Sequence, residues 1–230
     1  MAAGTCVGSR RRAFVAADRR APLSWAQEGM LEIVTDLQPY TETLNLTFTC
    51  RIPEGIDEEG VLRALVELVV NHEALRTVYI GPPEGPAQHV IGAGELVVEV
   101  IEVGADAGPD QADMVCRSLG RTPFDVSGEL PIRVALLTRD ARPWALAFAV
   151  FHLVIDAFGV DLLQRDMWHS MNRPAPATAR SIGAHQLVDE ADWQRSPEGR
   201  RQAERALRHH EDALRAMPQT MLPRPLIEEI

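Results

Sequence analysis

The sequence lacks lysine altogether: all 23 of its basic residues are arginine, set against 33 acidic residues. Without lysine, the protein cannot use an amine side chain as a nucleophile or as a Schiff base. The acidic excess gives a formal net charge of −10. Because phosphate contacts need a concentrated basic face, this charge argues against a nucleic-acid partner.

Cysteine is scarce, and its spacing indicates no site. Cys6, Cys50 and Cys116 are far apart, without a CxxC pair or a histidine at ligand spacing. The sequence therefore predicts neither a metal site nor a disulfide framework, and a reducing cytoplasm fits this usage best. No segment reaches the roughly 18 uninterrupted apolar residues of a membrane span, so we expect no membrane partner. The arginine-rich start lacks the apolar core of an export signal, and residues 1–20 are predicted to be a mobile tail.

Apolar periodicity, by contrast, is plentiful, and hydrophobic residues make up 46% of the chain. "TLNLTFTCRI" (residues 43–52) alternates strictly, which predicts a half-buried strand. Residues 56–75 repeat apolar side chains at helical spacing behind a potential N-cap, Asp57. Three shorter β-rich runs follow, at residues 76–80, 88–92 and 95–103.

Two longer apolar runs, at residues 123–140 and 142–156, have a short turn between them and predict adjacent antiparallel strands. The second run does not alternate from Trp144 to Phe151, which indicates burial on both faces. Helices are predicted around residues 110–119, after Gly159, and from Ser196 to Met217, the last with proline at its first position. This order indicates an α/β (α+β) fold with a mixed, largely antiparallel sheet flanked by helices.

A histidine and an aspartate interrupt the end of the second run. His152 lies at the strand end, and Asp156 follows in the turn where the chain leaves the sheet. An uncharged imidazole at the mouth of a cleft can accept a proton near neutral pH, as acyl transfer to an amine or hydroxyl requires. A lone histidine in an apolar run is also typical of a core residue, so the two residues alone leave both interpretations open.

Further stretches extend this pattern, and together they resemble the signature motifs of condensation domains of nonribosomal peptide synthetases. "PLSWAQEGML" resembles the opening SxAQ motif, and "NHEALRTVY" resembles RHExLRTxF, the most specific match. "VFHLVIDAFG" resembles the active-site motif HHxxxDG, and "LVDEADWQRS" is similar to the Tyr-rich motif after the first lobe. The matching positions are Ser24, Ala26, Gln27, His72, Glu73, Leu75, Arg76, Thr77, His152 and Asp156.

The resemblance covers residues 20–225 and implies a chloramphenicol-acetyltransferase-like fold. Such a fold has two similar lobes around a tunnel. This chain would hold the N-terminal lobe at residues 21–171, followed at 172–230 by a linker and a connecting helix toward a missing C-terminal lobe. That lobe is expected on the same or another chain, with self-association as the alternative because a lone lobe would expose an apolar face.

The same resemblance implies an acyltransferase that needs its second lobe. A carrier-bound acyl or peptidyl thioester would pass to an amine, with His152 as base or positioner. Asp156 and Arg76 would be paired and structural. The implied partners are peptidyl or acyl carrier proteins, which deliver the phosphopantetheine arm, so no cofactor is bound directly.

Two departures from the HHxxxDG motif favour other functions. Phe151 replaces the first histidine, which removes a polar group that would brace the loop. Ala157 replaces the glycine, two residues before Gly159; its methyl group would lie beside the tunnel and disfavour a positive φ. One alternative is a non-catalytic module that docks carrier proteins or recruits a partner enzyme. Another is an ester-forming acyltransferase of the same superfamily.

The remaining candidate residues have simpler interpretations. His209 and His210 are expected on the solvated face of a charged helix. His72 lies on the apolar face of its helix and is expected in the core or behind the residues that contact the substrate, not as a catalytic residue. An acidic cluster without histidine partners is expected on another solvated helix face. It consists of Asp189, Glu190 and Asp192.

Overall fold

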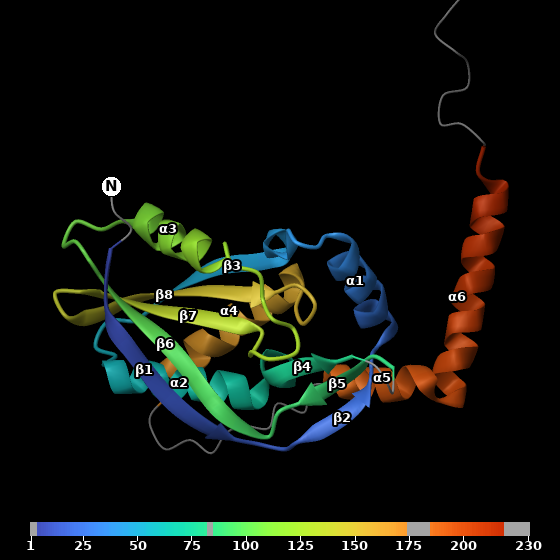
Figure 1. Cartoon of the computed structure of the whole chain (residues 1–230), viewed down its shortest axis with the longest axis horizontal. Helices are drawn as coiled ribbons and strands as arrows, with labels where there is room; N and C mark the ends of the chain where they lie inside the picture. Colours follow the sequence, from blue (N-terminus) through green and yellow to red (C-terminus); the bar gives the residue numbers. More distant parts are fainter. Residues whose placement is uncertain (1–3, 82–84, 174–184, 219–230) are drawn as a thin grey trace, which may run out of the picture. The chain divides into compact units, whose positions relative to one another are not determined.

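A computed structural model describes residues 4–81, 85–173 and 185–218 (Figure 1). Within the predicted linker and connecting helix at 172–230, residues 174–184 and 219–230 lie outside the described residues. The elements are β1 (Thr5–Val15), β2 (Arg19–Pro22), α1 (Trp25–Asp36), η1 (Thr41–Leu44), β3 (Asn45–Arg51), α2 (Glu58–Asn71), η2 (Glu73–Arg76), β4 (Thr77–Ile80), β5 (Ala87–Val90), β6 (Ala93–Val103), α3 (Pro109–Leu119), β7 (Ile132–Arg139), β8 (Arg142–Phe151), α4 (Ala157–Met171), α5 (Leu187–Arg195) and α6 (Pro197–Ala216).

The main sheet has the strand order β1-β6-β7-β8-β3. Only β6 and β7 run parallel; the other neighbours are antiparallel, which confirms the mixed, largely antiparallel sheet. The predicted hairpin is β7–β8, with Arg139 opposite Arg142. Its two turn residues, Asp140 and Ala141, have φ values of 51° and 58°, the left-handed geometry that suits a two-residue hairpin.

The main sheet is covered on both faces. Alternate residues of β7 and β8 face different helices: Leu136 and Phe148 belong to the core under α2 and α4, whereas Leu137 and Ala147 pack with α3. Figure 1 shows α3 on one side of the sheet and α2 and α4 on the other. From Ala145 to Phe151, no residue of β8 is more than 3% exposed, which confirms the predicted burial of both faces.

The N-terminal segment is not the predicted tail. Residues 5–15 form β1, which pairs antiparallel with β6. Phe14 is 2% exposed and joins the main core, while Arg10 and Arg12 reach back to the acidic first turn of α2 at Glu58 and Glu59, each at 2.5 Å. The arginines suggested a solvated segment, but Arg10, Arg12 and Phe14 lie two residues apart on one face of the strand, and both arginines are paired with glutamates.

Strands β2, β5 and β4 form a second, antiparallel sheet. The start of α5 packs on it, because Val188 and Ala191 are buried with Ala21 and Val90. The chain divides into two compact units, Met1–Ala191 and Asp192–Ile230, and residues well past the predicted boundary at 171 belong to the first unit.

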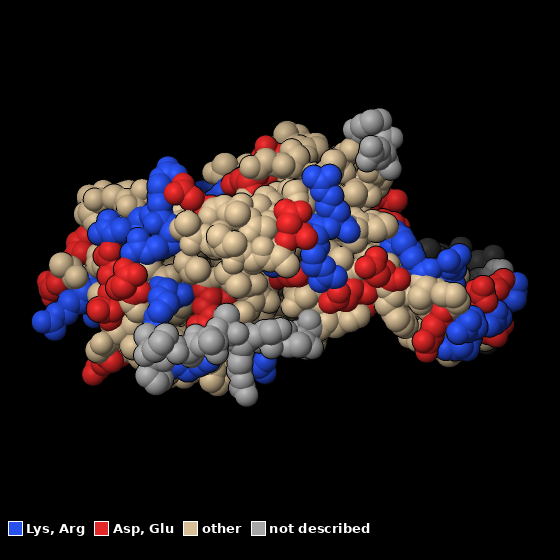
Figure 2. Space-filling view, turned by 90° about the horizontal axis from the view of Figure 1, so that it is seen from below, with Lys and Arg blue, Asp and Glu red and all other residues tan. Residues whose placement is uncertain are grey.

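The second unit contains α6, which begins where predicted, with Ser196 as N-cap and proline at the first position. His209 and His210 are exposed on it, as expected. Over the part of the chain that is described, no helix is both long and apolar enough to cross a membrane. Arginine and acidic side chains are interspersed on the face shown in Figure 2, in keeping with their many ion pairs.

Candidate active site

His152 stands at the point where the chain leaves the main sheet. Strand β8 ends at Phe151, and the backbone N–H of His152 still donates to Leu44 O across β3 at 3.1 Å. The ring Nδ1 lies 2.8 Å from Ile155 O. A carbonyl oxygen can only accept, so the proton is assigned to Nδ1. In the neutral ring, Nε2 is then the atom with a lone pair for a substrate.

The turn that holds His152 forms one wall of a cleft of about 460 Å³. Helix α1, the α2–η2 junction and residues 185–190 supply the other walls. Most of the lining is aliphatic, contributed by side chains such as Met30, Leu75 and Leu163. The structure thus brings His152, Asp156 and Gly159 to one cleft, as the sequence predicts, while Arg76, Phe151 and Ala157 lie outside its lining.

Asp156 caps helix α4 and does not pair with Arg76, so that prediction is wrong. Its Oδ1 accepts the backbone N–H of Gly159 at 2.8 Å, and its side chain is exposed. Helix α4 therefore begins at Ala157, earlier than the predicted start after Gly159. The interaction is the local N-cap hydrogen bond, in which a carboxylate satisfies an N–H that the first turn leaves without a helical partner.

Arg76 is the last residue of η2, and it is buried. Its Nη1 donates to Ala17 O at 2.7 Å and to Ile91 O at 2.8 Å, and its Nη2 lies 3.6 Å from Glu73 Oε1. Burial lowers the pKa of the Arg76 guanidinium, and the nearby Glu73 carboxylate offsets part of that effect. The arginine therefore links η2 to the segment before β2 and to the residue after β5, and these are not the partners that the sequence predicts.

The residues that depart from the HHxxxDG motif are readily accommodated. Phe151 is 1% exposed and packs on Phe124, with ring centroids 5.8 Å apart. Ala157 is exposed in the first turn of α4 and does not have a positive φ, so its methyl group neither strains the backbone nor narrows the cleft. Gly159 is the glycine the geometry needs, because a Cβ there would lie 2.5 Å from Ile155 Cγ1.

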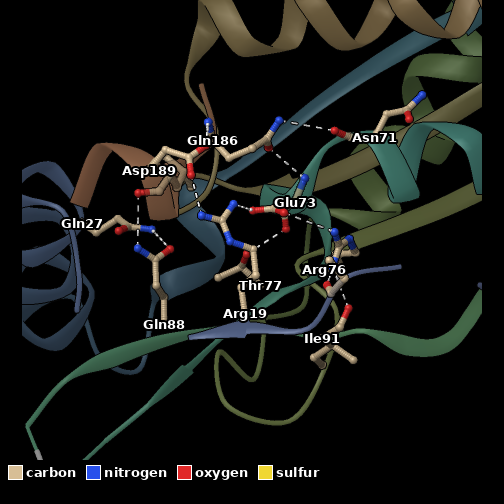
Figure 3. A network of polar contacts seen from close by, with 12 residues as sticks. Arg19, Gln27, Asn71, Glu73, Arg76, Thr77, Gln88, Ile91, Gln186 and Asp189 are labelled. Carbon is tan, nitrogen blue, oxygen red and sulfur yellow. Dashed lines mark hydrogen bonds and ion pairs between the residues drawn. The ribbon is translucent and has the colours of Figure 1, made fainter. Parts of the chain in front are cut away.

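The opening motif supplies contacts that sequence reasoning missed. Ser24 and Gln27 form a capping box at the start of α1, with Gln27 Oε1 accepting Ser24 N at 2.8 Å. The amide nitrogen of Gln27 donates to Tyr79 Oη at 3.0 Å and to Gln88 Oε1 at 3.1 Å, which ties α1 to β4 and β5. Figure 3 shows the contact between Gln27 and Gln88. The S-x-x-Q spacing of "SWAQ" is a capping-box signal and would have identified the first of these contacts.

His72 is part of a buried pair at the edge of the cleft. Its Nε2 lies 3.0 Å from Asp166 Oδ2 on α4. Burial lowers the pKa of His72, and the Asp166 carboxylate only partly counters this effect. The ring lines the His152 cleft and also a neighbouring pocket between α2 and α4. His72 therefore links the end of α2 to α4 at the edge of the cleft, where its side chain is 12% exposed.

Residues 185–190 form the cleft wall that comes from farthest along the chain. Gln186 Oε1 accepts the backbone N–H of Glu73 at 3.1 Å, and Arg19 donates to Glu73 at 3.0 Å and to Asp189 at 2.5 Å (Figure 3). Arg19 lowers the pKa of the Asp189 carboxyl group. Glu190 contacts His185, whose Nε2 lies 2.8 Å from Glu190 Oε2.

The acidic cluster therefore differs from its prediction as a solvated face without histidine partners. Asp189 pairs with an arginine, and Glu190 pairs with a histidine at the cleft. The ion pair of Asp189 could not be predicted from the local sequence, because its partner, Arg19, lies 170 positions away. Within the described ranges, no group of three or more histidine, cysteine or acidic side chains is arranged to hold a metal ion.

The layered mixed sheet with its flanking helices is that of the chloramphenicol-acetyltransferase-like fold. Solved structures of that fold match it. The condensation domain of the Monacolin K polyketide synthase MokA has a TM-score of 0.70 at 20% identity, covering 90% of this chain and 45% of that one. The X-domain in complex with OxyB, from teicoplanin biosynthesis, gives 0.66 at 22% identity, covering 97% and 48%.

The chain belongs to the condensation domain family, whose model matches residues 17–228. Phosphinothricin tripeptide synthetase PhsC of Streptomyces viridochromogenes is 33% identical over 186 residues, 77% of this chain and 17% of that protein. The nonribosomal peptide synthetase CymA of Salinispora arenicola is 30% identical over 176 residues, 76% of this chain and 2% of that protein. The chain thus spans a small part of these synthetases and about half of the solved condensation structures.

Proposed function

We propose that this chain is the N-terminal lobe of a condensation domain that transfers a carrier-bound acyl or peptidyl thioester to an amine. The observation that carries the proposal is the fixed His152 ring: Nδ1 bonded to Ile155 O leaves Nε2 as proton acceptor in an apolar cleft. We expect the synthetase that contains this site to be cytoplasmic. Its partners are peptidyl or acyl carrier proteins, and the phosphopantetheine arm that they deliver is part of the substrate.

In this reaction the amine nitrogen attacks the thioester carbonyl carbon. The C–N bond forms, the C–S bond breaks, and the proton lost by the amine passes through His152 Nε2 to the departing thiolate. Asp156 contributes indirectly, since its cap fixes the start of α4 next to the turn that holds His152. The aliphatic walls exclude water, which would otherwise compete with the amine as nucleophile.

The test is amide formation by the assembled synthetase carrying His152→Ala or His152→Gln. We expect product formation to fall about a hundredfold or more, as for loss of a general base, while circular dichroism and carrier binding stay unchanged. The matched control is His169→Gln, because His169 is an exposed histidine of α4 outside the cleft lining. Normal product from well-folded His152→Ala protein would rule out the catalytic assignment.

The second half of the site is proposed to come from a C-terminal lobe on the same or another chain. Helix α6 offers a surface for it, because Leu207 and Leu214 lie seven residues apart, about two helical turns, and Met217 follows three residues further on. The side chains of this apolar stripe are 68%, 68% and 64% exposed, in that order. Leu207→Glu with Leu214→Glu should prevent association with the second lobe in sedimentation experiments. Self-association through the same stripe, with no second lobe, is the alternative outcome.

A non-catalytic docking module is the second candidate function. It is favoured by the fold similarity to the X-domain that was solved in complex with OxyB, and by the phenylalanine in place of the first motif histidine. If the assembled protein binds a carrier protein or an enzyme without forming product, the docking function is favoured over the catalytic one. An ester-forming transferase is the third candidate. It is distinguished from an amide-forming enzyme by its acceptor substrate, because a hydroxyl acceptor would react and the matching amine would not.

A further inference from the structure

We propose that the hydroxyl group of Tyr79 positions the His152 turn (residues 151–155) and, through it, the ring of His152. This inference rests on the acyl-transfer function proposed above and names a further positioning residue for that reaction. Tyr79 lies on β4, is 5% exposed and is not part of the cleft lining. It can therefore act on a substrate only through the residues of the turn.

Three hydrogen bonds determine the shape of the His152 turn. His152 Nδ1 is bonded to Ile155 O at 2.8 Å, so the direction of the ring depends on where that carbonyl group lies. The peptide group that follows Leu153 stands between the two along the chain. Its N–H donates to Phe151 O at 3.1 Å, and its C=O accepts from the Tyr79 hydroxyl at 3.3 Å. The hydroxyl group thus holds the carbonyl end of a peptide group on which the ring contact depends.

The directions of the hydrogen bonds around Tyr79 follow from the partners of Gln27. Gln27 Oε1 accepts the backbone N–H of Ser24 at 2.8 Å, so Nε2 is the atom that donates to Tyr79 Oη at 3.0 Å. The hydroxyl oxygen accepts this bond, and its single proton is left for Leu153 O, which can only accept. Burial raises the pKa of Tyr79, so the hydroxyl group keeps that proton at neutral pH.

The side chains behind Tyr79 are buried and paired. Gln27 and Gln88 are 3% and 0% exposed, and Gln27 Nε2 also donates to Gln88 Oε1 at 3.1 Å (Figure 3). Gln88 lies opposite Tyr79 in the second sheet, and its Nε2 donates to Pro22 O at 3.0 Å and to Leu187 O at 3.4 Å. Because these bonds join α1, β4 and β5, the hydroxyl group is held on a rigid support, as precise positioning requires.

The first experiment measures the tautomer of His152 in the full chain. Nitrogen-15 NMR of histidine-labelled protein reports which ring nitrogen carries the proton, and the His152 signals are assigned from His152→Gln. We expect the Nδ1–H form in the wild type. Tyr79→Phe removes the hydroxyl group and keeps the ring, so the protein should fold while His152 becomes a mixture of both tautomers.

The second experiment measures amide formation by the assembled synthetase. Tyr79→Phe should lower kcat about tenfold and change the KM for the acceptor carrier by less than about twofold, because it misplaces the base without altering carrier binding. In a His152→Ala background, Tyr79→Phe should have no further effect, since the ring that the hydroxyl group positions is gone. A loss by the same factor in both backgrounds would mean a purely structural role and overturns the inference.

Tyr40→Phe is the matched control, because it removes the same hydroxyl group from the other tyrosine of the chain, which is 66% exposed and outside the cleft lining. It should leave the His152 tautomer and kcat unchanged. An unchanged tautomer or an unchanged kcat in folded Tyr79→Phe protein also overturns the inference and leaves acyl transfer intact. Normal product from His152→Ala counts against the proposed function itself, and the inference falls with it.

Discussion

Two substitutions at Asp156 distinguish a helix cap from an ion pair. In the structure its Oδ1 accepts the Gly159 N–H at 2.8 Å, and asparagine accepts this hydrogen bond nearly as well as aspartate. We expect Asp156→Asn to lower the free energy of unfolding by at most about 0.5 kcal/mol, through the lost charge near the helix dipole. Asp156→Ala removes the acceptor and should cost about 1 kcal/mol.

An ion pair with Arg76 predicts a different pattern. Arg76 is 2% exposed, so a carboxylate that neutralised it could not be lost cheaply. Breaking a buried pair costs about 3–5 kcal/mol, and asparagine and alanine would be similarly damaging. Combining Asp156→Ala with Arg76→Met would then give strong coupling, whereas sites that do not interact add within about 0.5 kcal/mol.

Urea unfolding monitored by tryptophan fluorescence provides the assay, with changes read from the midpoint at constant slope. Asp57 is the matched control, since its carboxylate caps α2 by accepting Gly60 N at the same 2.8 Å. Its asparagine and alanine variants should reproduce the Asp156 pattern. The cap assignment fails if Asp156→Asn costs about 3 kcal/mol while Asp57→Asn costs almost nothing.

Two further predictions concern buried groups. Because burial lowers the pKa of His72, the unfolded chain binds more protons below about pH 6.5. The stability of the wild type relative to His72→Gln should therefore decline in urea titrations as the pH falls from 7.5 toward 5.5; a constant difference would contradict the burial argument. Burial also raises the pKa of Cys50 to about 12 and of Cys116 to about 11, so a thiol reagent at pH 7.5 should label only the exposed Cys6 in the folded protein. Rapid labelling of all three would contradict their placement.

Periodic patterns made the strands and helices predictable from sequence. The alternation at residues 43–52, the unbroken apolar run of β8 and the proline at the start of α6 each correspond to the element found. Strand β1 was missed because its three consecutive arginines, Arg10 to Arg12, resemble a solvated tail. Two of them are neutralised by glutamates some 47 positions away, and sequence periodicity carries no information about such partners.

The same distinction between local and distant contacts explains which features of the candidate site could be predicted from the sequence. His152 was predictable, since a strand end followed by a turn is a local pattern. The partner of Asp156 was assigned by resemblance to a distant arginine, although D-x-x-G at residues 156–159 has the local spacing of an N-cap interaction. Local side-chain hydrogen bonds compete effectively with distant ones because less chain entropy is lost in closing them. The nearer donor, here the Gly159 N–H, is therefore the better first hypothesis for the partner of Asp156.

This reassignment also changes the weight of the departures from the family motif. If Asp156 had to neutralise Arg76, a change in the turn around Asp156 would break that ion pair and leave a buried charge without its partner. As an N-cap, Asp156 needs only an accessible N–H at Gly159, and an alanine at the first helical position satisfies the geometry. Phe151 likewise fills the core and does not face the cleft. Both residues lie outside the lining of the cleft that contains His152, so neither obstructs the proposed acyl transfer sterically.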